Sequence, residues 1–206
     1  MSYFKSYFES ISIGLNVSKY LRFSKAINPE MFFEDIQLLI HNLKKSKGRM
    51  YLFGNGASSA FANHMALDFS KNGGVLSRSL SDSALLTALS NDYSYESAMV
   101  EYLKIEGIGP HDLVITISSS GNSANVVNVL NFCKENKITT IAFSGLKAEN
   151  ESTKRADYSI YVPMKTYGMV ECIHQIILHL ILDESMGIYE WDRNDYQNMN
   201  SDHFNI

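Results

Sequence analysis

The 206-residue sequence predicts an α/β fold, namely a doubly wound, five-stranded parallel sheet of flavodoxin-like order with an N-terminal helical hairpin. From about residue 49 onward, short apolar segments alternate with longer amphipathic ones, which is typical of strands alternating with helices. The short segments are nearly continuous apolar runs, as expected of parallel strands that are buried on both faces. Right-handed crossover connections then leave few topologies for such a sheet.

The first part of the chain has a helical pattern instead. Residues 3–22 and 30–46 are amphipathic and rich in aromatic and aliphatic side chains. Asn28-Pro29 between them is typical of a turn followed by the start of a helix. We therefore expect a helical hairpin within residues 1–47. Its aromatic content is high for a surface element, which favours packing against another subunit.

The remaining elements are expected to be mainly alternating strands and helices. Strands are expected over residues 50–54, 74–80, 113–117, 139–145 and 158–163. Helices are expected over residues 57–71, 82–103 (one helix or two), 123–136 and 167–186. Residues 1–187 are thus expected to form a single domain. The polar, Asn- and Asp-rich residues 188–206 are typical of a partly disordered C-terminal tail.

The bulk composition excludes several classes of protein. The net charge is -4 and the pI about 5.8, so there is no basic surplus for binding nucleic acid. The two cysteines, Cys133 and Cys172, have neither disulfide-framework nor zinc-knuckle spacing. The N-terminus is too polar for a signal peptide, and no apolar run approaches the roughly 20 residues of a membrane span. We expect a cytoplasmic protein with neither nucleic acid nor a membrane as partner.

Two loops rich in serine and glycine carry the first functional signal. They read GNGASS (54–59) and SSSGNS (118–123), and they follow the first and third parallel strands. In this fold, ligands bind where the strand order reverses, which is between those two strands. Each loop opens a helix, whose free N–H groups and partial positive charge favour an anion. Serine hydroxyls add donors, and Gly56 and Gly121 allow the backbone to approach a ligand.

The loops therefore predict a binding site for a phosphate ester. Such a site can hold the ester without a Lys or Arg side chain. The expected anchor consists of Asn55, Gly56, Ser58, Ser118, Ser119, Ser120 and Ser123. Ser123 is also expected to cap the helix that follows it. The same composition is equally typical of a capped turn that binds nothing. Neither loop matches the phosphate loop of NTPases or the dinucleotide fingerprint, so we expect no nucleotide cofactor.

Polar side chains on two helices form the second candidate group. His64 and Asp68 are four residues apart, which places them on one face of a helix. The last helix carries Glu171, His174, Gln175 and His179. A His/Asp pair can also be a plain polar contact, and histidines on an apolar helix are more often core or interface residues than catalysts. Asn91-Asp92 is equally compatible with a helix end.

Three segments together resemble a known family. GNGASSAFANHMALDF, ISSSGNSANVV and GMVECIHQIILHLIL are similar to the sugar isomerase (SIS) domain and, within it, to the phosphoheptose isomerases. The likeness extends from the N-terminal hairpin to about Gly187. It implies a homotetramer with active sites at the subunit interfaces. It also implies conversion of sedoheptulose 7-phosphate to D-glycero-D-manno-heptose 7-phosphate through an enediol, for lipopolysaccharide or capsule.

The resemblance also implies roles for individual residues. Asp68 and His179 are the implied acid/base groups, and Asn91 and Asp92 lie near the sugar hydroxyls. The implied zinc ligands are His64, Asp68, Glu171 and His179. The sequence departs from the family pattern at two of these positions. Asp68 stands where relatives carry Glu, and Glu171 stands where they carry Gln. Because a shift of about 1 Å can cost on the order of a hundredfold in rate, the shorter Asp68 puts catalytic equivalence in question.

Two non-catalytic functions are also compatible with the sequence. Some proteins of this branch bind a protein partner instead of turning over a substrate, as the DnaA initiator-associating factor does, and that factor lacks the late histidine. His179 favours an enzyme, whereas Asp68 points weakly the other way. The other reading is a sugar-phosphate sensor that binds its ligand without turnover.

Overall fold

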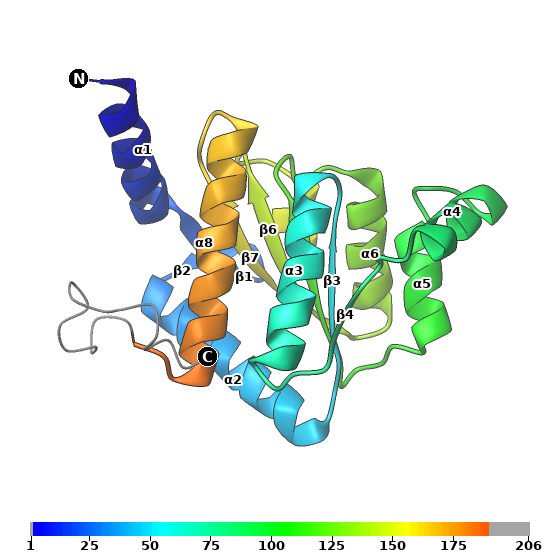
Figure 1. The fold of residues 1–206 in the computed structure, drawn as a ribbon. Helices are drawn as coiled ribbons and strands as arrows, with labels where there is room; N and C mark the ends of the chain where they lie inside the picture. Colours follow the sequence, from blue (N-terminus) through cyan, green and yellow to red (C-terminus); the bar gives the residue numbers. More distant parts are fainter. Residues whose placement is uncertain (1, 190–206) are drawn as a thin grey trace, which may run out of the picture.

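The computed structural model describes residues 2–189, so residues 190–206 of the expected tail lie outside the described residues. Its sheet has the order β2-β1-β7-β6-β5-β3-β4 (Figure 1). The parallel strands are β3 (Met50–Gly54), β4 (Ser77–Ser79), β5 (Leu113–Ser118), β6 (Thr139–Gly145) and β7 (Tyr158–Val162). In chain order these five are arranged 2-1-3-4-5, which confirms the doubly wound fold class of flavodoxin-like order.

Helices cover both faces of the sheet (Figure 1). One face carries α1 (Tyr3–Val17), α2 (Pro29–Ser46), α3 (Ala57–Lys71) and α8 (Tyr167–Met186). The other face carries α4 (Ser83–Asp92), α5 (Ala98–Glu106), α6 (Ala124–Glu135) and α7 (Glu151–Arg155). Each layer has its own apolar core against the sheet. Large side chains such as Phe32, Phe69 and Phe143 are fully buried, and each contributes about 1.5–3 kcal/mol to folding.

The N-terminal region differs from the expected helical hairpin. A β-hairpin of β1 (Lys19–Arg22) and β2 (Lys25–Ile27) separates α1 from α2. The first of these strands pairs antiparallel with β7, so the sheet has two more strands than the sequence pattern predicts. Tyr20 is buried in this arrangement and packs its ring against Phe32 and Phe33. The strand is therefore held by tertiary contacts.

The turn of this hairpin explains why the sequence pattern conceals it. Its two central residues, Phe23 and Ser24, have φ angles of 48° and 61°. Tight hairpin turns with two positive φ angles are usually made by Asn-Gly or Asp-Gly, so Phe-Ser is no hairpin signal. The strained turn is supported by tertiary hydrogen bonds, because Phe23 N donates to Asp157 O at 2.7 Å and Ser24 Oγ donates to Thr153 O at 3.0 Å.

Two smaller differences from the expected elements are found. The second parallel strand is shorter than residues 74–80, and the short helix α7 has no counterpart in the expected pattern. The segment 82–103 forms two helices, which is one of the two expected alternatives. The helices α3 and α8 coincide with expectation. Among the described residues, no helix is long and apolar enough to cross a membrane.

A buried histidine makes this fold sensitive to acid. His174 lies on α8 with no exposed surface, and its Nε2–H donates to Ser144 O of β6 at 3.0 Å. Its ring also meets the Phe143 ring edge-on. Burial lowers the pKa of His174 from 6.5 to about 4, because the charged form loses its hydration.

We expect the fold to lose stability between about pH 6.5 and 4 because of His174. The unfolded chain binds a proton at His174 before the folded chain does, so the free energy of unfolding falls as the pH drops through that window. The loss is on the order of 3 kcal/mol. Urea unfolding at several pH values should show a weaker pH dependence for His174→Leu. His41→Gln, an exposed control, should follow the wild type. Equal pH dependence of His174→Leu and wild type would contradict this account.

Candidate active site

The two serine-rich loops lie side by side at the point where the strand order reverses. β3 and β5 are neighbouring parallel strands, and Gly54 pairs with Ile117 at their carboxyl ends. The loops that follow therefore leave the same edge of the sheet and lead into α3 and α6. Gly56 precedes α3 with a φ angle of 55°, and Gly121 lies in the second loop with a φ angle of 66°. Both glycines thus adopt a backbone conformation that other residues rarely take.

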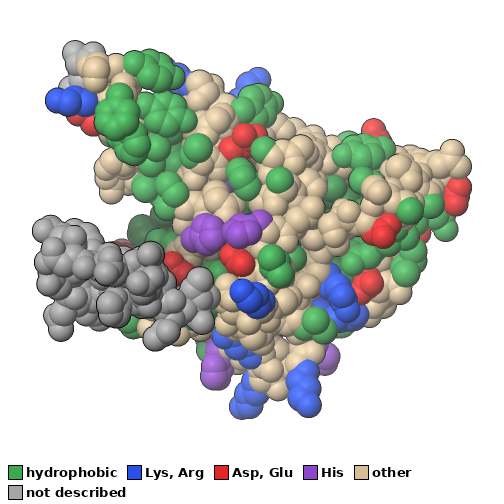
Figure 2. Space-filling model, viewed as in Figure 1, with side chains coloured by type: hydrophobic (Ala, Val, Ile, Leu, Met, Phe, Trp, Pro, Cys, Tyr) green, Lys and Arg blue, Asp and Glu red, His purple; other side chains and the backbone are tan. Residues whose placement is uncertain are grey.

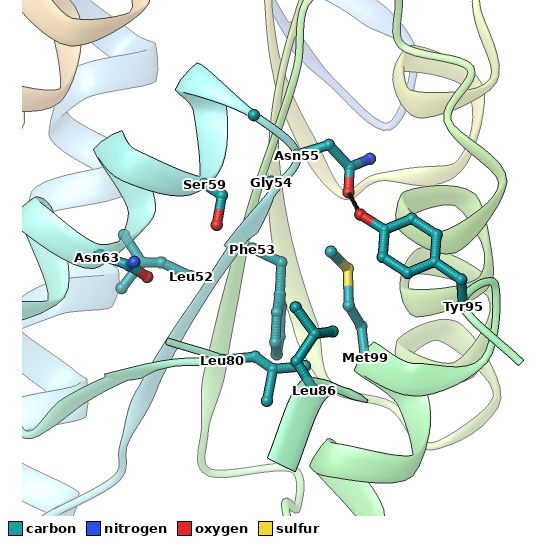
Figure 3. A pocket seen from close by; sticks show the side chains of 11 residues that line it. Leu52, Phe53, Gly54, Asn55, Ser59, Asn63, Leu80, Leu86, Tyr95 and Met99 are labelled. Carbon is teal, nitrogen blue, oxygen red and sulfur yellow. Dashed lines mark hydrogen bonds between the residues drawn. The ribbon is translucent and has the colours of Figure 1, made fainter. Parts of the chain in front are cut away.

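A reciprocal pair of amides connects the two loops. Asn55 Nδ2 donates to Asn125 Oδ1 at 2.9 Å, and Asn125 Nδ2 donates back to Asn55 Oδ1 at 2.8 Å. The Tyr95 hydroxyl donates to the same Asn55 oxygen at 2.8 Å, as Figure 3 shows. Asn125 is buried, and its oxygen also accepts from Val126 N at the start of α6. These bonds hold Asn55 in one orientation and fix the distance between the loops.

A small cavity of about 130 Å³ lies between these loops and the start of α8. Its lining consists of Asn55, Ser58, Ile117, Ser118, Ser119, Ser120, Ser123, Tyr167 and Glu171. The lining contains every residue of the expected phosphate anchor except Gly56, which lines a neighbouring cavity. The Ser119 hydroxyl is buried and has no hydrogen-bond partner within residues 2–189, so it is available to a ligand.

The serine hydroxyls are directed toward one another. Ser118 Oγ lies 3.2 Å from Ser123 Oγ and 3.5 Å from Ser120 Oγ. Ser123 does precede α6, as expected, but its side chain makes no capping hydrogen bond to the helix. The first turn of α6 therefore keeps N–H groups that a bound anion could satisfy.

A second cavity of about 290 Å³ also has Asn55 in its lining (Figure 3). It has apolar walls that include Phe53, Leu80, Leu86 and Met99. Polar side chains reach it from Asn55, Ser59, Asn63 and Tyr95. Because its walls are mainly apolar, this cavity suits an anion less well than the serine-lined cavity does.

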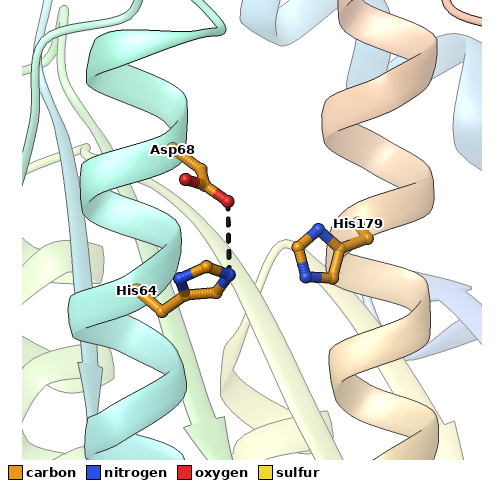
Figure 4. Close-up of side chains that lie close together, drawn as sticks. All are labelled: His64, Asp68 and His179. Carbon is orange, nitrogen blue, oxygen red and sulfur yellow. Dashed lines mark ion pairs between the residues drawn. The ribbon is translucent and has the colours of Figure 1, made fainter. Parts of the chain in front are cut away.

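A group of acid/base side chains lies farther along the same helices. His64, Asp68 and His179 each offer a ligand atom, and these atoms lie within 4.8 Å of one another. Figure 4 shows His64 and Asp68 on α3 pointing toward the His179 ring on α8. His64 Nε2 lies 3.2 Å from Asp68 Oδ2, and the two histidine rings meet with centroids 5.3 Å apart. The sequence-based prediction placed these three residues in one group.

This His/Asp cluster is open to the surface. The His64 side chain is 48% exposed, whereas that of Asp68 is 17% exposed. Figure 2 shows histidine side chains at the surface over α3 and α8, below the hydrophobic side chains of α1. A single copy of the chain therefore leaves the cluster accessible to a ligand or to another subunit.

Glu171 does not join the cluster. It lines the serine cavity, two turns of α8 before His179, and eight residues of helix span about 12 Å. Asn91 and Asp92 line neither cavity, because they form the exposed end of α4, where Asn91 Nδ2 donates to Asp92 Oδ1. Their expected contact with sugar hydroxyls stays a prediction.

Sequence reasoning passed over two residues of this region. Asn125 belongs to the quoted SGNSAN segment, but only the fold reveals that it pairs with Asn55. Gln175 was noted without a role, and its amide nitrogen lies 2.8 Å from His179 Nε2. Its position four residues before His179 is the signal that could have pointed to this contact.

We expect Gly121→Ala to damage the serine loop. Its φ angle is positive, and an added Cβ would collide with the Asn150 side chain. The substitution should lower the free energy of unfolding by about 1–3 kcal/mol and weaken binding of inorganic phosphate, measured by urea unfolding and calorimetry. Gly107→Ala is the matched control, since Gly107 also has a positive φ but open space around it. Intact phosphate binding in Gly121→Ala would contradict the role of the loop.

Comparison with known proteins identifies the family to which this chain belongs. A profile of the SIS domain matches residues 27–145, more than half of the chain. A phosphoheptose isomerase of Campylobacter jejuni is 35% identical over 143 residues, which cover 66% of this chain and 70% of that protein. A phosphoheptose isomerase of Sulfurimonas denitrificans is 34% identical over 157 residues, covering 73% and 79% of the two chains.

The fold agrees with the sequence comparison. The structure of a phosphoheptose isomerase from Neisseria gonorrhoeae superposes with a TM-score of 0.75 and covers 90% of this chain and 95% of the other, at 22% identity. The chain therefore belongs to the SIS domain family, in its phosphoheptose isomerase branch.

Proposed function

We propose that this chain, a sugar-phosphate isomerase by its family, interconverts sedoheptulose 7-phosphate and D-glycero-D-manno-heptose 7-phosphate. The product would supply heptose for lipopolysaccharide or capsule. Because the substrate is a phosphorylated sugar, we place the reaction in the cytoplasm.

One observation carries the proposal, which is the arrangement of two sites along α3 and α8. The serine cavity lies at the N-terminal ends of these helices, and the His/Asp cluster lies about two turns farther on. Sedoheptulose 7-phosphate has its phosphate at one end and its reacting carbonyl near the other. A substrate with its phosphate among the serines would extend along the two helices toward the cluster.

The residues of the cluster suit an aldose–ketose isomerisation. Asp68 would carry the proton from C1 to C2, so that the carbon–hydrogen bond breaks at one carbon and forms at the other. His179 would give a proton to O2 of the ketose and accept one from O1 as the enediol collapses to the aldose. His64, paired with Asp68 at 3.2 Å, would hold the carboxylate in position. At the other end, the Ser119 hydroxyl and the N-terminus of α6 would bind the phosphate.

We propose zinc as the metal of this site. The donor set fits, because His64, Asp68 and His179 supply two imidazole nitrogens and a carboxylate, a common protein set for catalytic zinc with an open position. When bound, zinc would polarise the carbonyl and stabilise the developing oxyanion. Glu171 was expected as a fourth ligand, but its place in the serine cavity favours a role in contacting the substrate.

We also propose a homo-oligomer, with a tetramer as the expected form. The support is an apolar surface on α1, where Tyr3, Phe4, Phe8 and Ile13 are exposed. Exposed Leu67, Ile176 and Leu180 lie on α3 and α8, beside the His/Asp cluster. Exposed apolar side chains next to an open site are typical of a subunit interface.

The first test is turnover of sedoheptulose 7-phosphate followed by NMR, with zinc and with a chelator. We expect an aldoheptose 7-phosphate to form in the presence of zinc. Asp68→Asn should lower kcat about 10²–10⁴-fold, because the base is lost, and it should leave phosphate binding intact. Asp68→Glu should keep measurable turnover as the conservative control. If wild-type protein binds the sugar phosphate without turnover, the chain is a sensor or scaffold and the proposal fails.

A second test concerns Glu171, the acidic side chain in the serine cavity. A carboxylate beside a phosphate dianion repels it, so Glu171→Gln should bind inorganic phosphate about tenfold more tightly, equivalent to roughly 1.4 kcal/mol. Calorimetry at low salt measures the change. Glu184→Gln, on the same helix but outside the cavity, is the control and should bind as the wild type does. Unchanged affinity in Glu171→Gln would place the anion elsewhere.

A further inference from the structure

Gln175 makes a contact that the family resemblance does not assign. It lies on α8 one turn before His179, and its amide Nε2 is 2.8 Å from His179 Nε2. The same nitrogen lies 3.4 Å from the sulfur of Met65, the neighbour of His64 on α3. Gln175 thus lies between the two helices that carry the His/Asp cluster.

In the metal-free protein, this hydrogen bond determines the tautomer of the neutral His179 ring. An amide nitrogen can only donate, so His179 Nε2 must accept. A neutral imidazole has one donor and one acceptor nitrogen, and its proton therefore sits on Nδ1. The contact with the His64 ring is edge-on, with centroids 5.3 Å apart, and does not set the tautomer in the same way.

The other end of the same amide argues against a purely structural role. Gln175 Oε1 is buried and has no hydrogen-bond partner within the described residues. A buried, unpaired carbonyl oxygen costs about 1–3 kcal/mol. A methionine at this position would match the length of the side chain, pack against Met65 and avoid that cost. The unpaired oxygen thus makes glutamine a costly choice for stability, which favours a role in positioning His179.

We propose that Gln175 is a positioning residue that holds the His179 ring in its plane and, in the metal-free enzyme, in the Nδ1–H tautomer. This inference rests on the proposed function for its kinetic consequence, but the tautomer itself is independent of the substrate. A ring held in this way keeps a fixed orientation toward Asp68 across the gap between α3 and α8 (Figure 4).

The test compares Gln175→Met with wild type in two measurements. In metal-free protein labelled with ¹⁵N-histidine at pH 8, the imidazole ¹⁵N shifts should show the Nδ1–H tautomer for wild-type His179, and the substitution should shift the proton toward Nε2. With sedoheptulose 7-phosphate, kcat should fall about 10–100-fold while KM changes less than twofold, as is typical when the partner of a working histidine is removed.

Stability measurements separate positioning from damage to the fold. The free energy of unfolding of Gln175→Met should equal or exceed that of the wild type, because the unpaired carbonyl is gone. Gln37→Met is the matched control, since Gln37 bonds the end of α8 through Ile181 O and Glu184. It should leave the His179 tautomer and kcat unchanged.

These measurements test the role of Gln175 separately from the proposed function. An Nε2–H tautomer in wild-type protein, or a tautomer that Gln175→Met does not alter, would overturn it. So would an unchanged kcat in an active enzyme. If the wild type does not turn over the heptulose at all, the proposed function fails, and the ¹⁵N shifts still test Gln175.

Discussion

The reciprocal amide pair between Asn55 and Asn125 is the interaction on which the geometry of the site depends. It joins the loop after β3 to the helix after β5. β3 and β5 are the two strands between which the strand order reverses. Two partly buried hydrogen bonds between uncharged amides fix the distance between this loop and α6 without bringing a cation next to the serine cavity. The hydroxyl groups of the second loop remain available to a ligand.

The packing of α3 against α8 fixes the positions of side chains that lie farther from the loops. Both helices lie on the same face of the sheet and start near the serine cavity. Side chains at similar distances from these two helix starts are therefore in contact. His64 and Asp68 face His179 across this contact. A shared apolar core under both helices holds them side by side, and the polar cluster is carried on its outer surface.

Much of the fold and part of the site could be predicted from the residues alone. Short, mainly apolar runs identified β3 and β5, because central parallel strands need no polar face. The β-hairpin at residues 19–27 could not be predicted, since Tyr20 is placed by tertiary packing and the turn lacks a hairpin sequence. Helical spacing was enough to pair His64 with Asp68. The eight-residue spacing of Glu171 and His179 also indicates that they lie about 12 Å apart on one helix. It could not reveal that Glu171 lines the serine cavity, because that depends on which loops approach α8.

The eight-residue interval between Glu171 and His179 has a consequence for the choice of substrate. The interval places the anion cavity and the acid/base groups about 12 Å apart on one rigid element. A helix does not stretch, so under the proposed function the number of carbon atoms between phosphate and carbonyl would be a condition for reaction. Shorter sugar phosphates would then occupy the serine cavity without reaching Asp68, and the spacing along the helix would act as a determinant of selectivity.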